Sequence, residues 1–148
     1  MTTSIRPATL SDIPALFTIR TCVTENALDL EQLAELGITP GTIAEAINHS
    51  PCAWIAEVDG APVGFSMVDG EDACVFAAFV LPGFEGRGIG RALMAQAEAS
   101  LFADHAVIWL ETAQASRASG FYRTLGWQVT QTLDDGDVRF EKKRAAER

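Results

Sequence analysis

The chain has 148 residues, of which 48% are hydrophobic and 21% are charged. This length and composition are typical of one globular domain, residues 1–148, that buries a core without disulfides or metal. The net charge is −9, and so acidic a chain repels nucleic-acid phosphates, which argues against a DNA- or RNA-binding role. No apolar run reaches the roughly 20 residues that span a bilayer, so we expect no membrane partner.

The first residues and the cysteines bear on the cellular compartment. Residues 1–6 contain no apolar signal core, so we expect no export. Cys22, Cys52 and Cys74 are odd in number and lack C-x-x-C spacing. This pattern favours reduced thiols that serve as small buried apolar side chains. We therefore expect a cytoplasmic protein without a metal site.

The first third of the chain is predicted to form a short strand and three helices. Ser11-Asp12 is the expected N-cap of the first helix, and Gly37 is the expected stop of the second. Thr39-Pro40-Gly41 is predicted to be a turn before the third helix. The strand is expected at residues 5–8, and apolar spacing places the helices at residues 11–24, 29–36 and 42–49.

After residue 51 the hydrophobic period changes from that of a helix to that of a strand. Two β-rich runs flank Asp59-Gly60, a dipeptide typical of a hairpin turn. A third run is apolar on both faces, as a central strand should be. These runs predict an antiparallel meander with strands at residues 52–58, 62–68 and 73–80.

A glycine-rich loop follows this meander and leads into a helix at residues 88–103. Glycine lets the backbone bend tightly and approach a ligand closely. The start of a helix offers unpaired N–H groups and the positive end of its dipole, and the combination binds phosphate or pyrophosphate. The loop matches neither the P-loop, which needs Lys-Ser/Thr after its last glycine, nor the dinucleotide fingerprint G-x-G-x-x-G.

The rest of the chain is predicted to form a fifth strand, a helix and a hairpin. Because a helical crossover joins the fourth strand to the fifth, these two strands should be parallel neighbours. Gly126 is expected to end the last helix. The strands are expected at residues 106–110, 127–133 and 138–142, and the helix at residues 116–126.

The run VLPGFEGRGIGRAL, residues 80–93, resembles the acetyl-CoA motif V-x-P-x-x-[QR]-x-x-G-x-[GA] of the GNAT superfamily of N-acetyltransferases. Glu85 stands where the family usually has Gln or Arg, which removes a favourable side chain from the cofactor site. A second run, A-x-x-F-Y-x-x-L-G-W at residues 118–127, is similar to the family's A-x-x-F-Y-x-x-x-G-F. The predicted element order is also that of the GNAT fold, so the resemblance covers nearly the whole chain.

The resemblance implies an α/β (α+β) fold with a mixed central sheet of about six to seven strands, flanking helices, and a V-shaped splay between the fourth and fifth strands. It implies an acetyl-CoA-dependent N-acetyltransferase whose acceptor is a primary amine of a small molecule, protein or peptide. Two alternatives are a non-catalytic acetyl-CoA sensor or interaction module and a nucleotide-binding protein. Retention of Tyr122 argues against the first, and the antiparallel meander argues against the second. A homodimer stays open.

The resemblance also assigns cofactor-binding residues. Backbone groups of Phe79 and Val80, freed by the splay, would pair with the pantetheine arm of acetyl-CoA. The side chains of Arg87 and Arg91 either add positive charge near the phosphates or face solvent. By the same resemblance, the pyrophosphate would be held by the backbone amides of Gly86, Arg87, Gly88, Ile89, Gly90 and Arg91.

Four further residues concern the acceptor and the chemistry. Tyr122 matches the family's usual general acid, the alternative being a tyrosine packed on the core. Glu111, at the expected end of the fifth strand, resembles the Glu of the L-E-V sequence in some protein N-terminal acetyltransferases, where it is proposed as the base. Glu25 and Asn26 fall in the loop between the first helices, which shapes the acceptor site in this superfamily. They serve the acceptor site or merely cap a helix.

Overall fold

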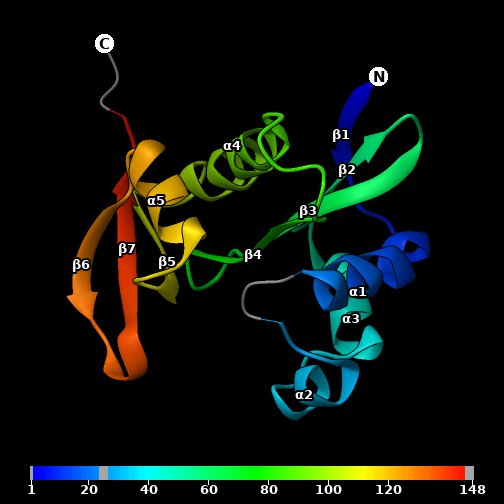
Figure 1. The fold of residues 1–148 in the computed structure, drawn as a ribbon, viewed down its shortest axis with the longest axis horizontal. Coiled ribbons are helices and arrows are strands. Elements are labelled where there is room, and N and C mark those ends of the chain that lie inside the picture. The colour runs from blue at the N-terminus through cyan, green and yellow to red at the C-terminus, as the bar shows by residue number, and fades with distance from the viewer. Residues whose placement is uncertain (1, 24–26, 146–148) are drawn as a thin grey trace.

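One mixed sheet of seven strands, in the order β1-β2-β3-β4-β5-β7-β6, organises the protein. It is seen in a computed structural model that describes residues 2–23 and 27–145 (Figure 1). β4 and β5 pair in parallel, and the other neighbouring strands pair antiparallel. The strands are β1 Thr3–Pro7, β2 Ala53–Val58, β3 Ala61–Asp69, β4 Cys74–Val80, β5 Val107–Ala113, β6 Gln128–Thr132 and β7 Asp137–Lys143. The expected order of helices and strands along the chain and the parallel pairing of the fourth and fifth strands are confirmed.

Helices cover both faces of the sheet. The hydroxyl of Ser66 in β3 donates to the carbonyl oxygen of Leu93 in α4, 3.0 Å away. Phe65, the neighbour of Ser66, points to the opposite face, where it meets Leu16 of α1. Because successive strand residues face opposite sides, α4 and α1 cover different faces. The helices are α1 Ile13–Cys22, α2 Leu30–Glu35, α3 Pro40–His49, α4 Ile89–Phe102 and α5 Arg117–Thr124.

Two helix starts differ from the sequence-based expectation. A 3-10 turn, Leu10–Asp12, precedes α1. Asp12 is the N-cap residue of α1, as expected, but its carboxylate accepts the Thr9 N–H at 2.7 Å and makes no side-chain cap to α1. Pro40 belongs to α3, so the predicted turn there was wrong. Proline suits the first turn of a helix because its missing N–H would have no partner within the helix.

An ion pair fastens the start of the chain to the sheet. The Arg6 guanidinium donates to both carboxylate oxygens of Asp12, at 2.7 and 2.9 Å, and to Glu57 of β2 at 3.0 Å. The hydrogen bond from Arg6 lowers the pKa of Asp12 to about 2. Asp12 therefore stays ionised at neutral pH and keeps β1 and α1 joined.

The fifth strand and the cysteines also correct the expectation. β5 continues past Leu110 to Ala113 because its last residues pair with β7. Among the cysteines, Cys52 is buried and Cys74 is half-buried, but Cys22 is exposed, contrary to the prediction that each would be buried. All three are free thiols.

A hydrogen-bonded cluster holds the last helix and strands against α4. Lys142 of β7 donates to Glu98 of α4 at 2.6 Å and to the carbonyl oxygen of Leu125 at 2.8 Å. The buried indole of Trp127 donates to the other carboxylate oxygen of Glu98 at 3.2 Å. Gly126, with a φ of +95°, ends α5 as predicted. The cluster fixes where α5 sits beside the sheet.

Candidate active site

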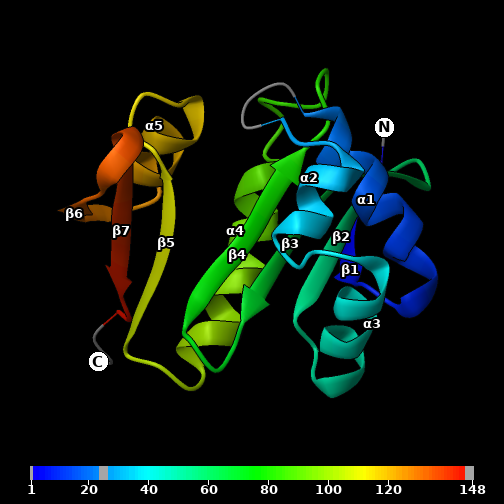
Figure 2. The ribbon, with the colours of Figure 1, turned by 90° about the horizontal axis from the view of Figure 1, so that it is seen from below.

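The sheet is split between β4 and β5. The residue pairing between these strands is Cys74 with Trp109, and the Trp109 N–H donates to the carbonyl oxygen of Ala73 at 3.0 Å. Beyond that point the strands diverge, as Figure 2 shows. We call the Cys74–Trp109 side the closed end of the V and the side of Val80 and Ala113 the open end. The expected splay is confirmed.

The glycine loop begins at the open end. It runs from Leu81 to Gly88, and Gly83, Gly86 and Gly88 have φ angles of +94°, +76° and +81°. L-residues avoid this left-handed region, so the path of the loop depends on glycine. A Cβ atom added at Gly86 or Gly88 would have no protein atom within 4 Å. The backbone here is therefore open to a ligand.

Gly88 is the N-cap of α4. The loop is fixed to its own arm by the Leu81 N–H, which donates to the carbonyl oxygen of Val63 at 2.8 Å, and by the buried side chain of Ile89. The first N–H groups of α4 thus lie on a fixed backbone, with the positive end of the helix dipole among them. This arrangement can bind a phosphate group.

Gly90 has a different role from the loop glycines. A Cβ atom there would lie 3.4 Å from the Phe121 ring of α5. Gly90 therefore allows α4 and α5 to pack closely at the edge of the V. Its side-chain position is closed to a ligand, although its amide belongs to the first turn of α4.

The charged side chains of the loop lie at the surface. The guanidinium of Arg87 stacks over the Phe84 ring, 5.1 Å from its centroid, and Arg91 is exposed on the first turn of α4. The Glu85 carboxylate pairs with Arg117, the first residue of α5, at 2.7 Å. The loop thereby contacts the element that follows β5.

Tyr122 lies on the buried side of α5. Its ring packs between Trp127 and Phe140, with centroid separations of 6.2 and 6.0 Å. The residue is buried, with 7% of its surface exposed. Burial raises the pKa of Tyr122 to about 12. The phenol is therefore protonated at neutral pH and able to donate.

Glu111 lies within β5 and not at its end, which corrects the expected position. It is exposed and stands opposite Arg139 of β7. The Cys74 thiol has its pKa raised to about 12 by burial first, then by the charges of Asp72, Asp69 and Glu111. Along β5, Glu111 lies between Trp109 at the closed end and Ala113 at the open end.

The other two residues predicted on the acceptor side, Glu25 and Asn26, lie outside the described residues.

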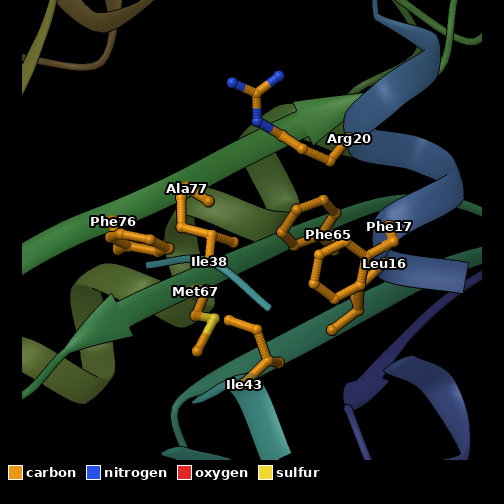
Figure 3. A pocket seen from close by; sticks show the side chains of 9 residues that line it. All are labelled: Leu16, Phe17, Arg20, Ile38, Ile43, Phe65, Met67, Phe76 and Ala77. Carbon is orange, nitrogen blue, oxygen red and sulfur yellow. The ribbon is translucent and has the colours of Figure 1, made fainter. Parts of the chain in front are cut away.

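An apolar pocket of about 40 Å³ adjoins β4 on the face covered by α1 and α3 (Figure 3). A bulge between β3 and β4 turns Phe76 toward it, beside Ala77. The buried Arg20 lies at its edge, with its guanidinium 4.4 Å from the centroid of the Phe79 ring. Burial lowers the pKa of Arg20. The pocket is lined by Leu16, Phe17, Arg20, Ile38, Ile43, Phe65, Met67, Phe76 and Ala77.

Sequence reasoning missed this pocket. The available signal was Arg20, a charged residue beside the apolar stripe of the first helix next to Ile19. Within residues 2–23 and 27–145, no His, Cys, Asp or Glu side chains form a group of three that could hold a metal. No helix in the same part of the chain is long and apolar enough to cross a membrane.

Comparison with known proteins agrees with this geometry. The chain resembles the structure of PaiA N-acetyltransferase from Thermoplasma acidophilum in complex with coenzyme A at 18% identity and a TM-score of 0.78, covering 97% of this chain and 100% of that one. It resembles Ard1 from Thermoplasma volcanium at 17% identity and a TM-score of 0.77, covering 97% and 99%. For ribosomal-protein-alanine N-acetyltransferase from Brucella melitensis the identity is 23% and the TM-score 0.69, covering 95% and 99%.

A search of curated protein sequences gives no significant match. The profile of the acetyltransferase (GNAT) domain matches residues 49–129, which is more than half of the chain. The matched segment contains the split pair of strands, the glycine loop and Tyr122. The chain belongs to the GNAT family of acetyltransferases and is an acyltransferase.

Proposed function

We propose that this protein is an N-acetyltransferase that uses acetyl-CoA as its donor, with residues 1–148 as one catalytic domain. The observation that carries the proposal is the opening between β4 and β5, which has a glycine loop and the start of α4 at its open end. The resemblance to PaiA N-acetyltransferase in complex with coenzyme A supports it. The acceptor is a primary amine of a small molecule, protein or peptide.

The residues at the open end fit acetyl-CoA. Phe79 and Val80 pair with β3 on one side, and in the described residues β5 does not pair with them on the other. Their outward backbone groups can therefore bind the pantetheine amides. The amides of Gly86–Arg91 would hold the pyrophosphate, with Arg87 and Arg91 adding positive charge at the surface.

Acetyl-CoA supplies the acetyl thioester. Tyr122 is the general acid, because its phenol is protonated and α5 packs against β5 beside the V, where the hydroxyl can donate to the leaving sulfur. Glu111 is the general base for the incoming ammonium. Its carboxylate would act directly or through a water.

The acceptor approaches from the face of the sheet opposite α4. Phe79 contributes to both sites. Its backbone is proposed to bind the cofactor, and its ring lies under the Arg20 guanidinium at the edge of the apolar pocket. The pocket offers an apolar surface to the part of the acceptor next to its amine. Glu25 and Asn26, in the segment after α1, would add polar contacts to the acceptor.

Turnover with a panel of amines tests the function. The purified protein is incubated with acetyl-CoA and single amines, including amino acids, polyamines and short peptides, and free coenzyme A thiol is measured. Amine-dependent thiol release is expected for at least one class. Binding of acetyl-CoA without release for any amine would favour the sensor alternative. Thermal stabilisation by NAD or ATP and none by acetyl-CoA would contradict the proposal.

A further inference from the structure

The ion pair between Glu85 and Arg117 joins the two arms of the V at its open end. Glu85 belongs to the loop after β4, and Arg117 begins the helix after β5. The carboxylate oxygen and the guanidinium nitrogen are 2.7 Å apart. The residue after Glu85 is Gly86, where the phosphate-binding backbone begins, so Arg117 is held beside the place proposed for the coenzyme phosphates.

The pair is exposed and therefore weak. The Arg117 side chain is 75% exposed and that of Glu85 is 39% exposed. Ion pairs in such surroundings contribute little to stability because water screens the charges and ordering two side chains costs entropy. Replacing Glu85 by another anion as a partner of Arg117 therefore costs little free energy. The two arms stay joined by the backbone hydrogen bond at the closed end.

A phosphate group would compete well for Arg117. A guanidinium has five N–H donors in a planar fork that matches the geometry of a phosphate group. The Glu85 carboxylate, in contrast, repels a phosphate that reaches the loop. An anionic coenzyme arriving at the loop is therefore attracted by Arg117 and opposed by Glu85.

We propose that Arg117 is a phosphate-binding residue of the coenzyme site and that Glu85 holds it in the free protein, so that binding exchanges the carboxylate for a phosphate. This rests on the proposed use of acetyl-CoA. The pyrophosphate and the 3′-phosphate share the required chemistry. In this arrangement Arg117 supplies, from the other arm, the positive charge that the loop lacks at position 85.

Calorimetric titration with acetyl-CoA tests the exchange without relying on turnover. Arg117→Gln should raise the dissociation constant about fivefold to tenfold, as expected for loss of one exposed charge-assisted contact. Glu85→Gln should lower it about twofold to fivefold, because the competing carboxylate is gone. Arg123→Gln removes the same charge from the far end of α5 and should change it less than about twofold.

Repeating the Arg117→Gln comparison with coenzyme A and 3′-dephospho-coenzyme A assigns the phosphate. A loss that persists with the dephospho form identifies the pyrophosphate, and one that disappears identifies the 3′-phosphate. Equal affinity of the Arg117→Gln variant and the wild type would overturn the inference and leave the proposed function standing. Weaker binding by the Glu85→Gln variant would overturn the exchange. A wild type that binds no acetyl-CoA would refute the proposed function itself.

Discussion

The two ends of the V are held together by different kinds of contact. At the closed end the arms share a backbone hydrogen bond, and the Trp109 indole donates to the carbonyl oxygen of Asp72 at 2.7 Å. At the open end they meet through the exposed pair of Glu85 and Arg117. The closed end is thus a fixed joint, whereas the open end exposes backbone groups and uses contacts that a ligand can replace.

The same difference explains the burial along β4. The strand is apolar throughout, as a central strand should be, yet Phe76 is 47% exposed and the last three residues are half-buried. A strand with a neighbour on each side would bury these residues. Among the described residues, β5 pairs with β4 only at Cys74, so the apolar side chains and outward backbone groups of the later β4 residues are available for a substrate.

The largest effect is expected at Tyr122, beside the V. Tyr122→Phe keeps the ring and its packing and removes the proton donor, so kcat should fall about 10²- to 10⁴-fold. Because burial raises the pKa of this phenol to about 12, it does not titrate near neutrality, and the ratio of wild-type to variant kcat should stay constant there. Affinity for acetyl-CoA should not change. A loss below about threefold would mean that Tyr122 serves packing alone.

The second prediction concerns Glu111 of β5 as the proposed general base. Glu111→Gln should lower kcat about tenfold or more through the chemical step, with acetyl-CoA affinity intact. Glu141→Gln is the matched control, since Glu141 lies on the neighbouring strand β7 opposite Trp109. Wild-type turnover by the Glu111 variant across neutral pH would remove this residue as the base.

Gly88 tests the backbone site at the open end. Gly88→Ala should weaken acetyl-CoA binding about tenfold or more, because a methyl group then occupies the space where phosphate meets the backbone. Gly37→Ala is the control: both glycines have a φ of +81° and no protein atom within 4 Å of an added Cβ atom. The two variants should lose similar stability. Equal affinities for acetyl-CoA would place the phosphates elsewhere.

The smallest effects compare the stability of the two joints. Trp109→Phe removes the indole hydrogen bond at the closed end and should reduce the free energy of unfolding by about 1 kcal/mol. Arg117→Gln at the open end should reduce it by less than about 0.5 kcal/mol. Urea unfolding followed by circular dichroism measures both. A larger loss for Arg117→Gln would show that the open end is a structural joint as well.

Much of this could be predicted from local sequence. The order of helices and strands followed from the change of hydrophobic period, the turn at Asp59-Gly60 and the helix stop at Gly126. The position of the proposed coenzyme site followed from the glycine loop. The end of β5 could not be predicted, because Glu111 and Thr112 are polar and become strand residues only by pairing with β7. Nor could the contact between Glu85 and Arg117, because it depends on how far the two arms diverge in space.

Hydrogen–deuterium exchange with and without acetyl-CoA would show directly whether the open end of the V is the coenzyme site. We expect acetyl-CoA to protect the backbone amides from Phe79 to Arg91. Amides at the closed end, from Asp69 to Cys74, should keep their exchange rates because their contacts do not change. Acetyl-CoA binding without protection of residues 79–91, or with its main protection at the closed end, would place the coenzyme site elsewhere.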